Sequence, residues 1–302
     1  MVKVIEINRG KDNWYFLLGL GILVLNKLRY SIFGYTKPKP FSSRQIKKAI
    51  DYDFHIVNLW NEYLRMYLGH QPEFKDKTIL ELGPGDNLGV GIILLSRGVK
   101  QYNAIDINNL IVRTPDEFYE ELFRQLENST QQDISSLREQ LKSLENNTIA
   151  GINYVYSPEF DLSVFKDKDI DFIFSQAAFE HFDDVGKTIE QISEISKSGT
   201  ILVAKIDLRT HSRYVREKDP LNIYRYPDWL YNLLKFQGSP NRVRPFEYAE
   251  LLEKNDWSDI TIFPLTTLPN QYISAINNKL YSRFRDKKCQ MEYLSIIICA
   301  RR

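Results

Sequence analysis

The spacing of apolar residues along the chain changes repeatedly between two patterns, and this change predicts an α/β fold. Short apolar runs of strand length alternate with longer stretches in which apolar residues recur at helical spacing. Helical spacing covers residues 43–69, 88–97, 183–196 and 245–255. The predicted strands are residues 77–82, 101–107, 152–156, 169–175, 200–206, 259–263 and 292–300. Strands that alternate with helices pair in parallel through right-handed crossovers, so we expect a mainly parallel sheet.

Two stretches depart from this alternation. Residues 115–147 are polar and rich in Glu, Gln and Leu, which predicts two amphipathic helices in an exposed insertion. Residues 207–243 carry aromatic and basic side chains without a clear period, and we interpret them as a second insertion. Two prolines in TKPKPFS (36–42) mark a linker. The predicted organisation is therefore an amino-terminal apolar segment and linker over residues 1–42, followed by one domain over residues 43–302.

The amino-terminal segment contains WYFLLGLGILVL (14–25), twelve apolar residues with basic residues on both sides. A spanning helix needs about 20 apolar residues, and no small-residue cleavage site follows. Three interpretations stay open: a helix packed on the domain or on a second subunit, a helix in a membrane interface, and a membrane anchor. Gly19 and Gly21 weaken all three, because glycine disfavours helix. We expect any peripheral membrane contact to involve residues 13–35.

Composition limits the class of protein only loosely. The 302 residues are 43% apolar, enough for a core of ordinary size. Forty basic and 39 acidic side chains give a net charge of +1, so overall charge does not drive the chain onto nucleic acid or a membrane. Two cysteines are too few for a disulfide framework. A reducing, cytoplasmic location is the expectation.

The stretch ILELGPGDNLG (79–89) places a glycine turn directly after a predicted strand. Ligands of open parallel sheets lie beyond the carboxyl ends of the strands, where such a turn exposes backbone N–H groups. A dinucleotide needs a third glycine, but Leu88 stands there, and Glu81 would face the pyrophosphate. S-adenosylmethionine instead has a cationic methionine end and a ribose diol, which suit Glu81 and Asp106, the residue that ends the next strand.

ILELGPGD with Asp106, DIDFIFSQAAFEHF (169–182) and TILVAKI (200–206) together resemble the class I S-adenosylmethionine-dependent methyltransferases. The motifs ELGPGD, SQAAFEH and KIDLRTH are similar to those of a type 11 bacterial branch of this family, which is associated with glycan and surface-polysaccharide gene clusters. The resemblance implies a Rossmann-like, seven-stranded, mostly parallel sheet with an antiparallel last strand and helices on both faces. It also implies a set of cofactor-binding residues: Glu81, Gly83, Pro84, Gly85, Asp106, Ile107, Ser175 and Gln176. Many relatives hold adenine with an aspartate after the third strand; here Glu159, Asp161 or neither serves.

Methyl transfer to a hydroxyl requires removal of its proton, and histidine suits that task. His181 follows the fourth strand and His211 follows the fifth, so both are candidate catalytic residues together with Asp207. Alternatively, the two rings brace their loops. Asp207 and His211, with Asp228, are also candidate ligands of a divalent cation. Their number and spacing are not diagnostic, so we do not predict a metal site.

We expect residues 205–244 to contact the acceptor. This segment contains nine basic, four acidic and six aromatic residues. Such a surface suits a phosphate- or carboxylate-bearing acceptor or sugar rings, and it could also bind single-stranded nucleic acid. Alternatively, the segment covers the sheet and its arginines are solvated. Near-neutral overall charge and the lack of a nucleic-acid module argue against RNA.

The preferred function is O-methylation of a glycan, glycolipid or other small-molecule hydroxyl at the cytoplasmic, inner face of the membrane. The alternative is a catalytically inactive methyltransferase-fold scaffold that binds partners through residues 13–35 and 115–147. A nicotinamide-dependent dehydrogenase is disfavoured by Leu88 and Glu81. The sequence leaves open whether the protein forms a homo-oligomer.

Overall fold

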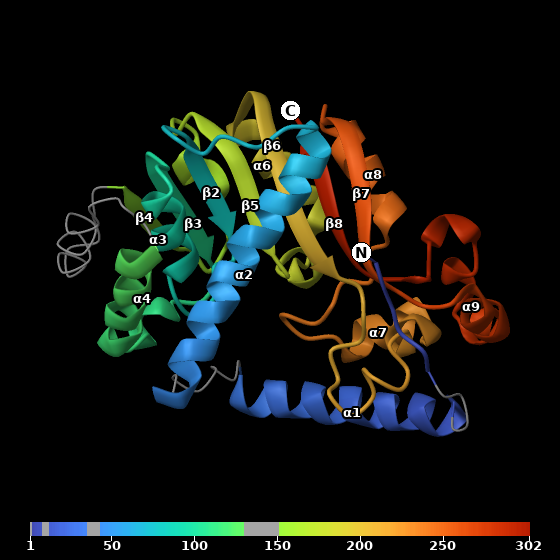
Figure 1. Ribbon diagram of the computed structural model, residues 1–302. Helices are drawn as coiled ribbons and strands as arrows, with labels where there is room; N and C mark the ends of the chain where they lie inside the picture. Colours follow the sequence, from blue (N-terminus) through green and yellow to red (C-terminus); the bar gives the residue numbers. More distant parts are fainter. Residues whose placement is uncertain (1, 8–11, 35–42, 130–150) are drawn as a thin grey trace.

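One eight-stranded sheet organises the computed structural model, which describes residues 2–7, 12–34, 43–129 and 151–302 (Figure 1). The strand order is β1-β7-β8-β6-β5-β2-β3-β4. Pairing is parallel except at β8, which runs antiparallel to both β6 and β7. The predicted α/β fold with an antiparallel last strand is confirmed. The strands are β1 (Lys3–Val4), β2 (Thr78–Leu82), β3 (Gln101–Asp106), β4 (Ile152–Tyr156), β5 (Ile170–Gln176), β6 (Ser196–Asp207), β7 (Ser258–Thr267) and β8 (Tyr293–Arg301).

The eighth strand is the only difference from the expected sheet of seven among the described residues. Residues 3 and 4 pair in parallel with Thr266 and Thr267 of β7, and the N–H of Ile5 donates to the carbonyl of Thr267 at 2.9 Å. Two residues are too short to show an alternation of apolar and polar positions. The sequence pattern therefore gave no sign of this edge strand.

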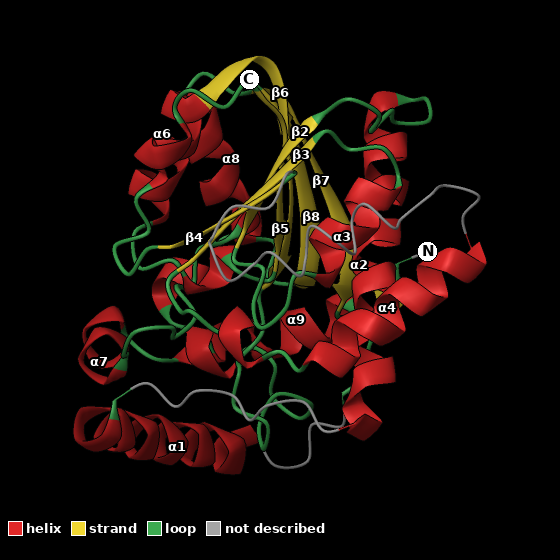
Figure 2. Ribbon diagram, turned by 90° about the vertical axis from the view of Figure 1, so that its left-hand side faces the viewer, coloured by secondary structure: helices red, strands yellow, loops and turns green. Residues whose placement is uncertain are grey.

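Helices cover both faces of the sheet, as expected, because successive strand residues point to opposite sides. Ile79 packs with α2 (Ser43–Leu68), α3 (Gly89–Ser96) and α4 (Asp116–Ser129). Leu80 packs on the other face with α6 (Val185–Ile195) and α8 (Pro245–Lys254). Figure 2 shows these two helical layers on either side of the sheet. The linker at 36–42 and the second helix expected before residue 147 lie outside the described residues.

A third apolar cluster lies beyond the carboxyl ends of the strands and is built from chain segments that follow β6 and β7. It contains η5 (Asn222–Arg225), α7 (Asp228–Leu234) and α9 (Asn270–Ile276). The remaining short 3-10 helices are η1 (Ile111–Arg113), η3 (Leu162–Phe165), η4 (Phe179–His181), η6 (Asn277–Lys279), η7 (Ser282–Phe284) and η8 (Lys287–Cys289). Much of this cluster comes from residues 207–243, in which the sequence showed no clear helical or strand period.

The amino-terminal apolar run belongs to a long helix, α1 (Asp12–Phe33), which lies across the carboxyl-end edge of the sheet next to α7 (Figure 1). Within the described part of the chain, residues 13–33 of α1 are long and apolar enough to cross a membrane, and 6% of the most apolar stretch is buried. The helix is 22 residues long, so the run of twelve apolar residues gave too short a length for it. Gly19 has a packing role, because a Cβ there would lie 2.0 Å from Oδ1 of Asn222.

Candidate active site

The glycine turn after β2 is held in a backbone conformation that favours glycine. Gly83 and Gly85 have φ of 74° and 83°, a region that other residues rarely adopt. The N–H of Gly83 donates to the carbonyl of Ile105 at 2.9 Å. A Cβ on Gly83 would lie 2.8 Å from the Cβ of Ala178, whereas a Cβ on Gly85 would meet no atom within 4 Å. The turn therefore packs on the segment after β5 on one side and is open at Gly85.

Asp106 connects this turn to the end of β3. One carboxylate oxygen accepts from the N–H of Asn108 at 2.8 Å, and the other accepts from the N–H of Gly85 at 3.3 Å. Burial raises the pKa of Asp106, while these backbone hydrogen bonds oppose the rise. Each carboxylate oxygen accepts more than one hydrogen bond. Asp106 thus keeps acceptor capacity for a pair of hydroxyl groups, and its predicted role in binding ribose stays a prediction.

Glu81 lies behind the turn, fully buried in β2. The hydroxyl of Tyr102 donates to its carboxylate at 2.5 Å. Burial raises the pKa of Glu81 to about 7, and the hydrogen bond from Tyr102 limits that rise. Near pH 7, the carboxyl group of Glu81 is therefore present in both its protonated and its ionised form.

Sequence reasoning missed Asp53, which α2 brings to the same place. Burial, followed by the nearby charge of Glu81, raises the pKa of Asp53 to about 8, and its Oδ2 has no hydrogen-bond partner. Gly89 makes room for it, since a Cβ there would lie 2.1 Å from that oxygen. The available signal was an aspartate among the apolar positions of the predicted helix at 43–69.

These carboxyl groups fit S-adenosylmethionine better than a dinucleotide. Asp53, Glu81 and Asp106 offer oxygen acceptors around an open glycine turn. The amino group, the sulfonium and the ribose diol of S-adenosylmethionine need acceptors or negative charge, whereas a pyrophosphate would be repelled. The unpartnered Oδ2 of Asp53 is a buried acceptor that a cationic ligand would satisfy.

The other predicted cofactor-binding residues are placed unequally. The hydroxyl of Ser175 is buried and donates to the carbonyl of Leu82 at 3.2 Å, so it ties β5 to β2. Gln176 donates to the hydroxyl of Tyr52 at 3.3 Å, and its buried Oε1 has no partner. Pro84 lies between the two turn glycines and Ile107 directly follows β3. The cofactor-binding roles of all these residues stay predictions.

The two candidates for adenine recognition after β4 differ in availability. Asp161 accepts from the N–H of Ser163 at 3.0 Å and thereby caps η3, while the side chain of Glu159 is exposed. Neither contact identifies the residue that holds adenine.

The structure brings His181 and His211 together, although thirty residues separate them in the sequence. Their ring centroids are 4.8 Å apart with the rings edge to face. Nδ1 of His181 lies 2.6 Å from the carbonyl oxygen of Gly238. Because a carbonyl only accepts, Nδ1 carries the proton and Nε2 keeps its lone pair. Burial lowers the pKa of His181 and lowers that of His211 to about 4, so both rings are neutral at pH 7.

Asp207 is engaged in ion pairs rather than with a histidine. Its carboxylate accepts from Nε and Nη2 of Arg209 at 3.0 and 2.9 Å and also from Arg216. Burial opposes ionisation, but the hydrogen bonds and charges of these arginines outweigh it and lower the pKa of Asp207 to about 2. The pairing of Asp207 with His211 as cation ligands, considered from the sequence, is therefore not formed.

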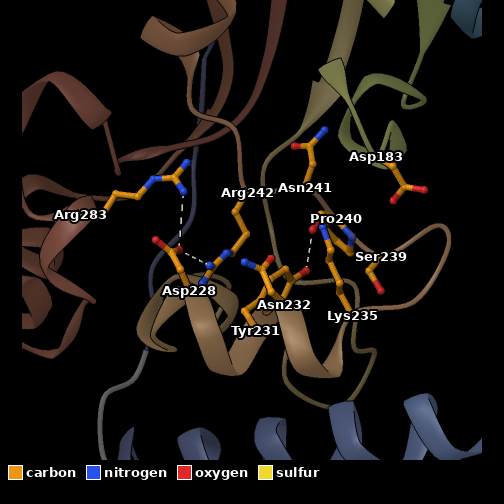
Figure 3. A pocket seen from close by; sticks show the side chains of 10 residues that line it. All are labelled: Asp183, Asp228, Tyr231, Asn232, Lys235, Ser239, Pro240, Asn241, Arg242 and Arg283. Atoms are coloured by element: carbon orange, nitrogen blue, oxygen red, sulfur yellow. Dashed lines mark hydrogen bonds and ion pairs between the residues drawn. The ribbon is translucent and has the colours of Figure 1, made fainter. Parts of the chain in front are cut away.

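Asp228 is likewise committed elsewhere, at a small polar pocket of about 70 Å³ next to α7 (Figure 3). Its carboxylate pairs with Arg242 at 2.5 Å and with Arg283 at 3.6 Å. The pocket lies beside the chain segment that carries Ser239 and Asn241 rather than beside the glycine turn.

Five of the nine basic residues expected on the acceptor surface bind groups inside the protein. Arg244 is fully buried and donates to the carbonyls of Cys289, Gln290 and Tyr293 at 2.9, 2.5 and 3.0 Å. The other four pair with aspartates: Arg209 and Arg216 with Asp207, Arg225 with Asp219, and Arg242 with Asp228. These five arginines therefore hold the segment over the edge of the sheet instead of offering their charges to an acceptor. Arg213, Lys218 and Lys235 remain as exposed basic residues.

Comparison with known proteins gives a family match and several similar folds. The model of a family described as methyltransferase domain matches residues 58–262. The CurJ carbon methyltransferase is 14% identical with a TM-score of 0.43, over 93% of this chain and 58% of its own. An S-adenosylmethionine-dependent methyltransferase from Mesorhizobium loti is 13% identical with a TM-score of 0.41, over 79% and 96%. Phosphoethanolamine N-methyltransferase 2 from Haemonchus contortus, solved with phosphomonomethylethanolamine and S-adenosylhomocysteine, is 14% identical with a TM-score of 0.45, over 91% and 56%. No curated protein matches the chain by sequence.

Proposed function

Because the chain belongs to the methyltransferase domain family and is an S-adenosylmethionine-dependent methyltransferase, we propose that it methylates a hydroxyl group of a membrane-borne glycan or glycolipid. One observation supports this most: the glycine turn, the histidine pair and the apolar helix α1 all lie at the carboxyl-end edge of the sheet (Figure 1). This arrangement supports the proposal that a cofactor site, a proton acceptor and a lipid-facing helix lie together.

When bound, S-adenosylmethionine supplies a methyl group activated by the positive charge on its sulfur. The chain would hold it with the open backbone of the turn at Gly85 and with the free acceptor capacity of Asp106 toward ribose. Asp53 and Glu81 add buried carboxyl groups that ionise more readily beside a cation. Binding would then release protons, because near pH 7 Asp53 is mainly protonated and Glu81 about half protonated in the free protein.

The histidine pair supports a hydroxyl as the receiving group. A hydroxyl loses its proton during transfer, and a neutral imidazole with a free Nε2 is able to accept it. The contact between Nδ1 of His181 and the carbonyl of Gly238 fixes the tautomer that leaves Nε2 free. His211, half-buried and neutral, lies against that ring.

The exposed face of α1 supports an acceptor at a membrane surface. Exposed apolar residues lie along one side of α1, at helical spacing apart from a gap at Gly21: Trp14, Leu17, Val24, Leu25, Leu28 and Ile32. We name this set the α1 stripe. Arg29 adds an exposed positive charge near its end, which suits anionic headgroups, whereas the ammonium of Lys27 donates to the carbonyl of Lys235 at 2.9 Å.

The opposite face of α1 is fastened to the domain. The hydroxyl of Tyr226 donates to the carbonyl of Phe16 at 3.0 Å, and Tyr30 stacks on Phe236 with centroids 5.1 Å apart. A helix attached near both ends lies along the protein surface, so we propose that α1 rests in the interface without crossing the bilayer. The location that follows is the inner, cytoplasmic face of the membrane.

Calorimetric titration of the purified chain tests the cofactor part of this proposal. We expect micromolar binding of S-adenosylmethionine and S-adenosylhomocysteine and none of NADH. Asp106→Ala should abolish the binding without unfolding the protein, because it removes the ribose acceptor and the support of Gly85. Absence of adenosyl binding by the unmodified chain would leave a catalytically inactive scaffold as the better description.

Sedimentation with vesicles of phosphatidylglycerol and phosphatidylcholine tests the membrane part. Leu17→Glu/Leu25→Glu places two charges in the α1 stripe, and we expect at least a tenfold loss of vesicle binding. The matched control is Val112→Glu/Val164→Glu, two exposed valines outside α1, which should bind vesicles like the unmodified chain. Equal binding by both double variants would remove α1 as the contact.

A further inference from the structure

Glu180, His181 and His211 form a compact group of metal-ligand side chains that was not recognised from the sequence. Glu180 and His181 belong to η4, directly after β5, and His211 follows β6. One ligand atom from each of the three lies within 4.8 Å of the others. Ligand atoms about 2.1 Å from one ion lie about 3 to 4 Å apart, so only a small side-chain adjustment would bring the three onto one ion. We call this group the His–Glu–His cluster.

The unpartnered atoms of the cluster point to a missing ligand. Glu180 is 2% exposed, and neither of its carboxylate oxygens makes a close hydrogen bond, although the backbone N–H groups of Glu180 and Asp207 are near enough to lower its pKa. Nδ1 of His211 is also buried without a partner. A buried carboxyl group with no partner is costly and calls for an explanation. A bound cation would satisfy the oxygens of Glu180 and a nitrogen of each histidine together.

The surroundings of the cluster hold it as metal ligands are usually held. Metal-binding histidines commonly donate their second N–H to a carbonyl oxygen, and Nδ1 of His181 does so to Gly238 at 2.6 Å. Asn241 fastens the η4 turn, since its N–H donates to the carbonyl of Glu180 at 2.8 Å and its amide to that of Phe179 at 2.7 Å. Figure 3 shows Asn241 on the segment that also carries Ser239 and Pro240.

The backbone that leads into the cluster is strained. Ala177, between β5 and η4, has φ of 55°, a conformation that costs energy for a residue other than glycine and is found at functional sites. Its N–H donates to the carbonyl of Lys205 in β6 at 2.9 Å. The strain therefore directs η4 toward the end of β6, where His211 follows.

We propose that the His–Glu–His cluster binds a divalent metal ion of the manganese, iron or zinc class. Two imidazoles and one carboxylate suit these ions, and three protein ligands leave coordination positions open. This inference rests on the proposed function: the open positions would take the acceptor hydroxyl, or two neighbouring hydroxyls of a sugar. Asp207, already paired with Arg209 and Arg216, stays outside the coordination sphere.

With Nε2 of His181 bound to the ion, this imidazole would no longer accept the proton, and the ion would instead lower the pKa of the bound hydroxyl. Coordination to a metal ion lowers the pKa of a bound hydroxyl, as it does that of bound water. In the transfer, the O–H bond of the acceptor breaks and its proton passes to water. The bond between that oxygen and the methyl carbon forms, the bond between methyl carbon and sulfur breaks, and S-adenosylhomocysteine leaves.

Electron paramagnetic resonance of free Mn²⁺, titrated into the chelator-treated full chain, tests the site without any acceptor. We expect saturable loss of the free-ion signal, and at least tenfold weaker binding by Glu180→Gln and by His211→Gln. His70→Gln, at an exposed histidine away from the cluster, is the matched control and should bind Mn²⁺ unchanged. Affinity for S-adenosylmethionine, measured on the same preparations, shows that each variant is folded.

The two measurements separate the two ideas. Retained cofactor binding with no Mn²⁺ binding, or with equal Mn²⁺ binding by all variants, would overturn the metal site and leave the methyltransferase function standing. Mn²⁺ binding that depends on Glu180 and His211 in a chain that does not bind the cofactor would support the site and overturn the proposed function.

Discussion

The glycine turn after β2 and the segment of residues 208–244 lie at the same edge of the sheet, but they are held in different ways. The turn depends on local backbone conformation at Gly83 and Gly85, on close packing against Ala178 and on hydrogen bonds from its backbone N–H groups to Ile105 and Asp106 at the end of β3. The 208–244 segment depends on buried arginines that reach distant parts of the chain, such as Arg244, which binds carbonyls more than forty residues away. A short sequence motif reveals the backbone conformation of a turn, whereas it does not reveal contacts between an arginine and distant parts of the chain.

Replacing Arg244 should have the largest effect of three changes that probe this comparison. Arg244→Met removes the side-chain donor of three carbonyl oxygens, of which that of Gln290 still accepts from the N–H of Tyr293 at 2.9 Å. Unmade buried hydrogen bonds cost about 1–3 kcal/mol each, and removal of a buried charge offsets part of that. We expect the free energy of unfolding to fall by about 3 kcal/mol, measured by urea denaturation. Arg213→Met, at an exposed arginine of the same segment, should change it by less than about 0.5 kcal/mol. Similar results for both would show that the segment is not held by its buried arginines.

Replacing Gly83 should have the next largest effect, on binding rather than on folding. Gly83→Ala places a Cβ 2.8 Å from that of Ala178 in a backbone conformation with φ of 74°. The turn must then move, and we expect affinity for S-adenosylmethionine to fall about 100-fold, which is about 2.7 kcal/mol. Gly199→Ala is the matched control, because Gly199 has φ of 89° and open space around it near the start of β6, at the opposite edge. Should Gly83→Ala bind as tightly as Gly199→Ala, the turn would not form the cofactor site.

The smallest effect concerns pH and the unpaired carboxyl groups near the turn. Burial, followed by the charge of Glu81, raises the pKa of Asp53 to about 8. Between about pH 4 and pH 8 the folded protein therefore binds a proton that the unfolded chain has lost, and stability falls as pH rises. We expect Asp53→Asn to reduce that fall between pH 6 and pH 8 by about 1 kcal/mol per pH unit, followed by thermal and urea denaturation.

An exposed carboxyl group provides the control for this pH dependence. Hydrogen bonds from Ser163 lower the pKa of Asp161, so Asp161→Asn should leave the slope between pH 6 and pH 8 unchanged. An identical slope in the unmodified chain and in Asp53→Asn would mean that Asp53 is ionised when folded. Asp53 would then be ionised, like the aspartates of the 208–244 segment that pair with arginines, and the contrast between the two regions would be lost.

Most of the sheet could be predicted from sequence because each strand is a short apolar run that forms its own pattern. The glycine turn and Asp106 were equally visible, since their chemistry depends on residues adjacent in the chain. Asp53 was not, because its role arises only when α2 packs against the start of α3, where Gly89 leaves space for it. The interior roles of the arginines depend likewise on partners that only the folded chain brings near.

The position of His211 shows the same limit from another side. Sequence placed His181 and His211 separately at the ends of two strands, and the structure adds that their rings touch. Because β5 and β6 are neighbours in the sheet, residues that follow them meet at one edge. Glu180 joined the pair only through the turn of η4, which no periodic pattern indicates.

The central position of β8 affects the order in which the protein is made. β8 lies between β6 and β7 in the sheet, although it follows both in the chain. During synthesis, β6 and β7 therefore wait for the strand that joins them, while α1 has already left the ribosome with its apolar side uncovered. With α1 bound to lipid as proposed, a growing chain would meet the membrane surface before its sheet is complete, and its last folding step would take place there.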